Sequence, residues 1–299
     1  MFPRSSGQRP AVSVLMPARN AERTISLALM STLSAMSKDD ELLVFDDGST
    51  DKTLDKVYAA KDPRIRVISG TGNAGVAAGL NRLLHEARHE IVARMDADDL
   101  MPPWRFSRQI DAMSISTSAV FTTRVNFGSS PTSWRQRLPL PIRKEDAPIL
   151  FVLENPVAHS SMMGWKRSIL GAGGYRSGAA EDYDLWLRLL ASGEDIRRIA
   201  LPGLLYRLHA DQVTRSPDWH QRYGNDVHLG MAHLALLRRL GWTGSQCWTI
   251  LHGHAALGDE DYSTASDFSL FYNDVLLPKV SSIHRPRQRF LLNRLLVSK

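Results

Sequence analysis

Cysteine is almost absent from this sequence, since Cys247 is the only one in 299 residues. A single thiol excludes an internal disulfide and a zinc site made of several cysteines, and it is typical of proteins in a reducing compartment. Long apolar runs are also lacking, because stretches such as 149–153 stop far short of the ~20 residues that a membrane span needs. The first residues contain no apolar segment of the secretory kind. We therefore expect a cytoplasmic protein without a transmembrane segment.

A large excess of either charge is lacking as well. The 37 Lys and Arg residues outnumber the 31 Asp and Glu residues by six, which suggests an anionic partner without saying which. A nucleic-acid-binding protein would need a basic stripe with interleaved aromatic residues, and the charges here are scattered. We therefore expect no nucleic-acid partner. The 43% of apolar residues suffice for the core of one large domain with an appendage, or of two domains.

Short apolar runs alternate with helical patterns over the first hundred residues. The runs have the composition and the closing prolines or polar clusters of buried strands, and they cover 12–16, 41–45, 64–68 and 90–95. The helical patterns cover 22–36, a stretch from 50 onward, and 75–88. Further on, the sequence predicts a helix over 104–113, a strand over 119–125, an irregular stretch over 129–148 and a helix over 181–191. This order predicts an α/β fold with a mostly parallel sheet flanked by helices, which binds ligands at the carboxyl ends of its strands.

Carboxylates follow two strands of the predicted sheet. Asp46 and Asp47 come after the second strand, and Asp96, Asp98 and Asp99 come after the fourth. Because parallel strands end at one edge of a sheet, we expect the two groups to converge, and crowded carboxylates need a cation or a hydrogen-bonding ligand. Mg²⁺ and Mn²⁺ take such oxygen ligands, so a metal–diphosphate complex is the expected occupant. The alternative is that each aspartate only forms a turn or caps a helix.

A series of short motifs runs along the chain in a fixed order. The motifs are VSVLMP at 12–17, DDGSTD at 46–51, NAG at 73–75, Asn81, DADD at 96–99, GGYR at 173–176, EDYDLWLR at 181–188 and YRLH at 206–209. Each motif is weak alone, but the ordered set is specific. It resembles the family-two glycosyltransferases of GT-A fold over about residues 11–215.

The resemblance implies an inverting transfer of a sugar from a nucleotide-diphosphate sugar to a hydroxyl group. The acceptor expected from it is a glycan or glycolipid precursor of the cell envelope. It implies that Asp96 lies near the ribose and the metal, that Asp98 ligates the metal (Mn²⁺ or Mg²⁺), and that Asp182 is the catalytic base. The residues expected to line the nucleotide sugar are Pro17, Ala18, Asn20, Asp46, Asp47, Asn73, Gly75, Asn81, Asp96, Arg207 and His209.

The chemistry of the residues agrees with these roles. An acceptor hydroxyl loses its proton as it attacks, which requires a carboxylate within reach, and Asp182 stands where the helix dipole favours an ionised group. Glu181 is its expected helper, and a cap without chemistry is the alternative for Asp182. His159 is the candidate for the acceptor site, against a purely structural histidine. Asn73, Gly75 and Asn81 open a helix that either meets a phosphate or ribose or simply packs closely.

Arg207 and His209 precede a polar segment that is expected to close over the donor, where both contact the diphosphate or the metal. Ordinary surface charges are the alternative. Arg105 and Arg108 are expected to be solvated charges on a helix, with phosphate binding as the alternative.

The expected domain organisation is a leader of residues 1–10, a catalytic domain of residues 11–215 and a helical extension of residues 216–299. Residues 283–299 contain five Lys and Arg and no acidic residue, so this tail either contacts an anionic membrane surface or forms a helix docked on the core. A sugar-phosphate nucleotidyltransferase is the alternative function, although residues 16–20 lack its glycine-rich loop. A non-catalytic nucleotide-sugar-binding relative is the other alternative.

Overall fold

The computed structural model describes two compact units. The described residues are 9–128, 135–136, 140–209, 216, 218–253 and 259–297. Unit 1 comprises Met1–Pro141, Val157–Ser177 and Asp195–His209, and unit 2 comprises Ile142–Pro156, Gly178–Glu194 and Ala210–Lys299. Unit 2 thus contains two segments from within the range expected for the catalytic domain. Residues 1–8 of the expected leader lie outside the described residues, and the domain boundary at residue 215 stays a prediction.

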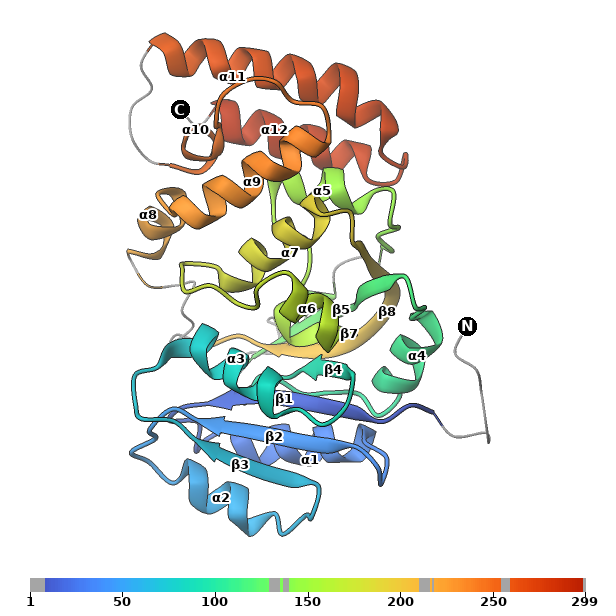
Figure 1. Cartoon of the computed structure of the whole chain (residues 1–299), viewed down its shortest axis with the longest axis vertical. Coiled ribbons are helices and arrows are strands. Elements are labelled where there is room, and N and C mark those ends of the chain that lie inside the picture. Colours follow the sequence, from blue (N-terminus) through green and yellow to red (C-terminus); the bar gives the residue numbers. More distant parts are fainter. Residues whose placement is uncertain are drawn as a thin grey trace. The chain divides into compact units, whose positions relative to one another are not determined.

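Unit 1 is built on a mixed sheet with the strand order β3-β2-β1-β4-β7-β5-β6, and β8 pairs with β5. The strands are β1 (Val12–Ala18), β2 (Glu41–Asp46), β3 (Ile65–Ser69), β4 (Ile91–Arg94), β5 (Thr117–Phe127), β6 (Arg135–Gln136), β7 (Met163–Trp165) and β8 (Asp195–Arg207). The first four are parallel to one another, as expected (Figure 1). Strand β7 runs antiparallel to both β4 and β5, and β8 is parallel to β5.

Helices flank this sheet because its central strands are apolar on both sides. The helical elements of unit 1 are α1 (Ile25–Ala35), α2 (Thr53–Ala59), α3 (Gly75–Glu86), α4 (Arg105–Ala112), the 3₁₀ turn η2 (His159–Ser161) and α6 (Lys166–Gly171). Val14 and Met16 of β1 are fully buried in one core with Leu29 of α1. Helix α3 approaches β2 so closely that a Cβ at Gly79 would lie 2.7 Å from the ring of Phe45. A larger residue at this position would force the ring of Phe45 to shift.

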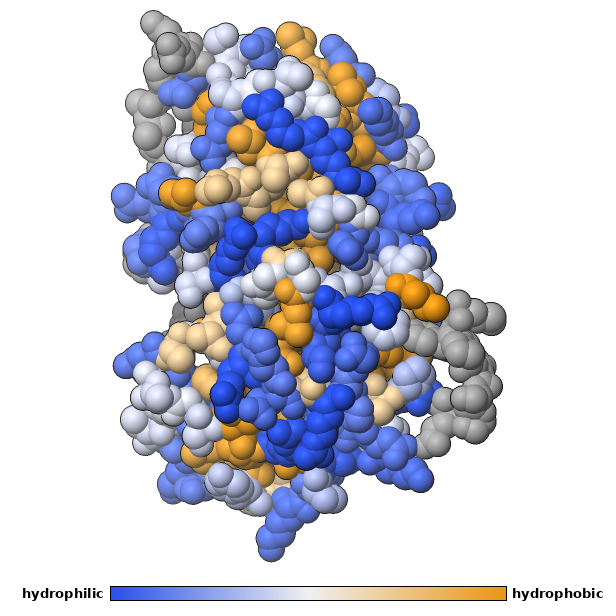
Figure 2. All heavy atoms as spheres, in the orientation of Figure 1, coloured by the Kyte–Doolittle hydropathy of each residue, from blue (hydrophilic) through white to orange (hydrophobic). Residues whose placement is uncertain are grey.

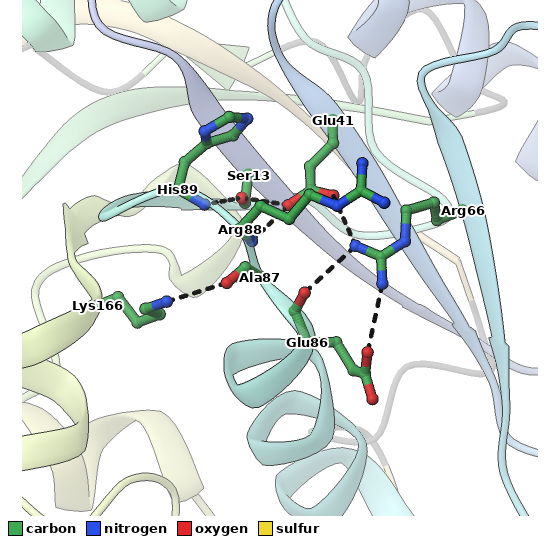
Figure 3. A network of polar contacts seen from close by, with 8 residues as sticks. All are labelled: Ser13, Glu41, Arg66, Glu86, Ala87, Arg88, His89 and Lys166. Carbon is green, nitrogen blue, oxygen red and sulfur yellow. Dashed lines mark hydrogen bonds and ion pairs between the residues drawn. The ribbon is translucent and has the colours of Figure 1, made fainter.

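A buried carboxylate ties the strands together at their amino ends (Figure 3). Glu41 accepts hydrogen bonds from the hydroxyl of Ser13 (2.7 Å), the backbone N–H of Arg88 (2.6 Å) and the guanidinium of Arg66 (2.8 Å). The Ser13 hydroxyl in turn accepts the backbone N–H of His89 (3.0 Å). Burial acts to raise the pKa of Glu41, but these hydrogen bonds and the charge of Arg66 lower it overall. The network fixes β1, β2, β3 and the entry of β4 at the edge opposite the carboxyl ends.

The regular elements among the described residues of unit 2 are helices and helical turns. Its elements are α5 (Ala147–Leu153), α7 (Glu181–Ala191), α8 (Trp219–Gly224), α9 (Val227–Arg239), α10 (Trp248–His252), α11 (Asp259–Phe271), a π-helical turn (Tyr272–Leu276), a 3₁₀ turn (Leu277–Lys279) and α12 (Arg285–Val297). Every residue of α5 except Pro148 is buried, which explains why its apolar run shows no helical periodicity in the sequence. The predicted helix over 181–191 is confirmed by α7.

The basic tail forms a helix docked within unit 2. Leu291 and Leu292 of α12 are buried, Gln288 accepts the hydroxyl of Tyr272, and Arg287 forms an ion pair with Glu154 at 2.7 Å. The two leucines therefore contribute to the core of the unit, as the docked alternative for the tail requires.

Exposed apolar side chains are scattered over the surface, and Figure 2 shows them among hydrophilic residues on the face in view. In unit 2 they include Met231 of α9, Leu270 of α11 and Phe290 of α12. Within the described part of the chain, no helix is long and apolar enough to cross a membrane.

Unit 2 also contains a histidine that should make its stability pH-dependent. His233 is fully buried on α9, where its Nε2 lies 2.9 Å from the carbonyl oxygen of Val152, and burial lowers its pKa to about 4. In the unfolded chain His233 takes up a proton below about pH 6.5, whereas in the folded chain it does so only near pH 4. The free energy of unfolding therefore falls by ~3 kcal/mol as the pH drops through this interval. We expect His233→Gln to remove this pH dependence of the free energy of unfolding, as measured by urea unfolding at a series of pH values.

The exposed His228 on the same helix supplies the matched control. His228→Gln should keep the pH dependence of the parent protein. Equal pH dependence in the two variants would contradict the assignment to His233.

Candidate functional site

Asp46 is a buried carboxylate at the carboxyl end of β2. It lies in register with Ala18 at the end of β1, and its side chain is almost fully buried. One oxygen, Oδ2, accepts the backbone N–H of Ser49 at 3.2 Å. The other, Oδ1, is buried and receives no hydrogen bond from the described residues. Because a buried acceptor without a donor costs free energy, Oδ1 is suited to accept a hydrogen bond from a ligand.

The loops beside Asp46 hold each other by hydrogen bonds. Ala18 accepts the backbone N–H of Asp47 (3.1 Å), and the preceding Pro17 is in register with a residue of β2. Asn20 has a left-handed backbone (φ 48°), and its amide oxygen accepts the backbone N–H of Thr50 at 2.9 Å. The structure therefore brings the predicted residues Pro17, Ala18 and Asn20 to the same sheet edge as Asp46.

Asp47 binds the start of α3. Its two oxygens accept the backbone N–H groups of Ala74 (2.9 Å) and Gly75 (3.0 Å). Asn73 and Gly75 are exposed and adopt left-handed backbones, with φ of 62° and 81°. Asp47 thus has a structural role at the start of a helix, in line with the alternative that these aspartates form turns or cap helices. A contact of Asp47 with the nucleotide stays a prediction.

The three aspartates after β4 form one group. Ligand oxygens of Asp96, Asp98 and Asp99 all lie within 4.8 Å of one another. Burial raises the pKa of Asp96 and raises that of Asp99 well above its ordinary value, and repulsion between the carboxylates adds to both shifts. Arg94 opposes part of this through an ion pair with Asp96. Asp46 and Asp47 are not in this group, since β1 separates β2 from β4.

The end of β8 packs against this group. The backbone N–H and Nε of Arg207 donate to Oδ1 of Asp99 (2.9 Å) and to the carbonyl oxygen of Asp98 (2.7 Å). The Nε2 of His209 lies 2.8 Å from Oδ2 of Asp98, and the hydroxyl of Ser160 donates to Oδ2 of Asp99 at 2.7 Å. The structure therefore joins Arg207 and His209 to the aspartates, from about 110 residues away in the sequence.

The expectation that Arg105 is a solvated charge is wrong. Its side chain is fully buried and donates to the carbonyl oxygens of Arg94 (3.0 Å) and Met162 (3.1 Å). Burial lowers the pKa of Arg105 to about 9, while the charge of Asp99 opposes that shift. The reason is that its guanidinium satisfies buried carbonyl oxygens from two distant segments, which the local sequence pattern does not reveal. Arg108, on the same helix, is exposed as expected.

His159, the candidate for the acceptor site, is paired with a tyrosine. Its Nε2 lies 2.9 Å from the hydroxyl of Tyr175, and burial together with the charge of Arg94 lowers its pKa well below 6.5. His159 is therefore neutral at physiological pH. Asn81 donates to the carbonyl oxygen of Tyr175 (2.8 Å) and accepts its backbone N–H (2.9 Å). Asn81 thus fixes the loop that carries the partner of His159.

Asp182 and Glu181 open α7 in unit 2, whereas all other predicted site residues belong to unit 1. Oδ1 of Asp182 accepts the backbone N–H of Tyr183 at 2.8 Å, and Oδ2 accepts the side-chain amide of Asn155 at 2.9 Å. The N-cap position is occupied by Ala180, so Asp182 is not the cap residue.

Comparison with known proteins decides the family. Residues 13–174, more than half of the chain, match the model of glycosyl transferase family 2. The chain belongs to this family.

Three similar proteins are named as glycosyltransferases. The glycosyltransferase EpsE of Bacillus subtilis is 34% identical over 68% of this chain and 74% of its own length. The amylovoran biosynthesis glycosyltransferase AmsE of Erwinia amylovora is 29% identical over 73% of this chain and 81% of its own length. WfaP of Escherichia coli, a β-1,3-glucosyltransferase named for UDP-Glc and α-D-GlcNAc-diphosphoundecaprenol, is 29% identical over 68% of this chain and 79% of its own length.

Solved structures show that this family-two glycosyltransferase has the GT-A fold. Staphylococcus aureus TarS 1–349 with UDP-GlcNAc superposes with a TM-score of 0.60 at 16% identity, covering 96% of this chain and 81% of that one. The mannosyltransferase PcManGT of Pyrobaculum calidifontis with GDP-Man and Mn²⁺ gives 0.55 at 20% identity, covering 97% and 86%. The predicted fold class is confirmed.

The aspartate group of this glycosyltransferase fits a hard divalent cation. It offers carboxylate oxygens alone, which Mg²⁺ and Mn²⁺ prefer. Their mutual repulsion, which adds to burial in raising the pKa of Asp99, is what a bound cation would relieve. Asp96 and Asp98 are more open than Asp99, whose two oxygens are engaged by Ser160 and Arg207.

Several residues of the site are missed by the sequence patterns. Ser160 and Arg94 contact the aspartates, Tyr175 contacts His159, and Asn155 contacts Asp182. Tyr175 lies within the GGYR motif at 173–176, and Asn155 stands four residues before His159, so their positions are the available signal. No local sequence pattern indicates a functional role for Arg94, which is the last residue of a strand.

Proposed function

We propose that this enzyme transfers a sugar, with inversion, from a nucleotide-diphosphate sugar to a hydroxyl group of a glycan or glycolipid precursor of the cell envelope. One observation carries the proposal. The buried, unpartnered Oδ1 of Asp46 lies at the same sheet edge as the oxygen ligands of Asp96 and Asp98. A nucleotide diphosphate offers the N–H of a base for Asp46, and its anionic diphosphate would bind at the aspartates together with a divalent cation. A uridine nucleotide is favoured because WfaP is named for UDP-Glc and TarS was solved with UDP-GlcNAc.

Asp46 would accept the base N–H, and the loop residues Pro17, Ala18 and Asn20 would enclose the nucleoside. Asn73 and Gly75 at the start of α3 would approach its ribose or phosphate. Arg207 and His209 would contact the diphosphate from the end of β8. The further residues assigned to the nucleotide-sugar site are Asp47, Asn81 and Asp96.

Asp98 and Asp96 would hold a divalent cation, Mn²⁺ or Mg²⁺. Such a cation would neutralise the charge that develops on the departing diphosphate. His209, whose Nε2 is 2.8 Å from Oδ2 of Asp98, would keep that carboxylate oriented.

Asp182 would act as the general base. As the acceptor oxygen forms its bond to the anomeric carbon, the bond from that carbon to the diphosphate oxygen breaks, and the acceptor proton passes to Asp182. Glu181 would assist at the same helix start, and neutral His159 would contact the acceptor. These roles would place the catalytic domain in residues 11–215, with residues 216–299 as its extension.

The acceptor is proposed from the relatives, whose names include a diphosphoundecaprenol-linked sugar. An acceptor of this kind lies at the membrane, so the enzyme would work in the cytoplasm, at the inner face of the membrane. The exposed basic residues of α12 would supply a peripheral contact with anionic lipids.

The test is donor binding by the purified protein. UDP-Glc, UDP-GlcNAc and GDP-Man are compared with and without Mn²⁺ for thermal stabilisation and for slow donor hydrolysis. At a concentration one hundred times its Kd, the true donor should stabilise the protein by ~2.7 kcal/mol, and Mn²⁺ should increase its affinity. Asp98→Asn should lose the Mn²⁺ effect, and Asp55→Asn, an exposed aspartate on α2, should keep it. Absence of any response to the nucleotide sugars would contradict the proposal.

A further inference from the structure

The side chain of Asn155 contacts the carboxylate of Asp182 directly. Asn155 follows α5, and its Nδ2 donates to Oδ2 of Asp182 at 2.9 Å. The other oxygen, Oδ1, accepts the backbone N–H of Tyr183 at 2.8 Å. The carboxylate is therefore held at both oxygens, by its own helix on one side and by Asn155 on the other.

A second bond already joins the same two segments. The hydroxyl of Tyr183 donates to the carbonyl oxygen of Phe151, near the end of α5, and both of these side chains are fully buried. The attachment of α5 to α7 therefore does not depend on Asn155, which is only half-buried. Its amide makes a specific contact with one carboxylate oxygen.

We propose that Asn155 is a positioning residue, which holds the carboxylate of Asp182 in one orientation and favours its ionised form for proton abstraction. This rests on the proposed role of Asp182 as the general base. The physical reason is that a hydrogen bond donated to a carboxylate stabilises the charged form and fixes the plane of the group. If the carboxylate is already ionised and oriented when the acceptor binds, it does not have to change its charge or orientation before it accepts the proton.

Other ionisable groups lie on the helix of Asp182 and on neighbouring elements. Glu181 and Asp184 lie on the same helix, Glu154 follows α5, and Tyr223 comes from α8. The charges of Asp182 and Glu154 both raise the pKa of Tyr223 above its ordinary value, in addition to the effect of burial. Glu154 is ion-paired with Arg287, and Asp184 with Arg188. The neutral amide of Asn155 acts directly on the Asp182 carboxylate.

The test compares Asn155→Ala, which removes the donor, with Asn155→Asp, which replaces it by a second carboxylate of the same shape. The pKa of the Asp182 carboxyl is measured by ¹³C NMR on protein labelled at aspartate, with the resonance assigned by its loss in Asp182→Asn. We expect this pKa to rise by roughly one unit in Asn155→Ala and by more in Asn155→Asp, because like charges then share the site. Asn273→Asp, the same change at an exposed position of unit 2, should leave it unchanged.

The second measurement is the rate of sugar transfer to GlcNAc-diphosphoundecaprenol. It uses the nucleotide sugar that the binding experiment identifies as the donor. We expect kcat to fall about tenfold in Asn155→Ala with the donor KM unchanged, and the acidic limb of its pH profile to move upward in Asn155→Asp. Asn155→Ser replaces Asn155→Asp if the latter does not fold.

The two proposals fail in different ways. Wild-type transfer by Asp182→Asn would overturn the base role itself. An inactive Asp182→Asn, together with Asn155 variants that match the parent in kcat and in the pKa of Asp182, would overturn only the positioning role. A raised pKa with an unchanged melting temperature supports it.

Discussion

Asp182→Asn is expected to reduce sugar transfer by about 10³-fold while leaving donor binding intact. General-base catalysis contributes 10²–10⁴-fold in typical enzymes, and an asparagine amide cannot accept the acceptor proton. The substitution keeps the shape of the side chain at the start of α7, so the folded structure should persist. The measurement is kcat at saturating donor, with the Kd of the donor from calorimetry.

The separation of rate from binding follows from the proposed roles. Asp182 is proposed to take the acceptor proton, whereas other residues are proposed to bind the nucleotide and the metal. Asp267→Asn, at an exposed position of α11, provides the control for loss of one negative charge. If Asp182→Asn transferred sugar at the rate of this control, Asp182 would not be the base.

Arg105→Met is expected to lower the free energy of unfolding by ~4 kcal/mol. Its guanidinium is fully buried and donates to Gln109 (2.8 Å) as well as to the carbonyl oxygens of Arg94 and Met162. Methionine fills much of the volume but leaves those buried acceptors without donors. A buried acceptor that loses its donor typically costs about 1–3 kcal/mol. Urea unfolding, followed by circular dichroism, measures the loss.

Arg108 supplies a matched comparison on the same helix. It is exposed, so Arg108→Met should change the free energy of unfolding by less than about 0.5 kcal/mol. A difference of less than about 1 kcal/mol between the two variants would show that the buried guanidinium is not required. Arg105→Lys should lie between them, since an ammonium cannot reproduce the planar set of donors.

The first half of the fold could be predicted because its patterns are local. Each strand from β1 to β4 is an apolar run closed by a turn, and each following helix has its own periodicity. The aspartates at 96–99 could be placed at the sheet edge for the same reason, since they directly follow β4. The structure confirms their grouping, and it leaves Asp46 in a separate position across β1.

The second half could not be predicted in this way. Strand β8 contains Pro202 and Gly203, which interrupt any alternating pattern, and its pairing with β5 has register shifts there. A Cβ at Gly203 would lie 2.5 Å from the side chain of Thr122, so the glycine serves the packing of β8 on β5. That requirement is invisible in the sequence, because the partner is about 80 residues away.

What the sequence alone determined is the family, the αβ order of the first hundred residues and the identity of the carboxylates. All of these depend on residues close together in the chain. What only the tertiary structure decided is which partner each polar group has. Arg105 donates to the carbonyl oxygens of Arg94 and Met162, Arg207 and His209 lie beside Asp98, and Asn155 donates to Asp182. The physical reason is that the state of a carboxylate depends on burial and on donors from distant segments, which only folding brings together.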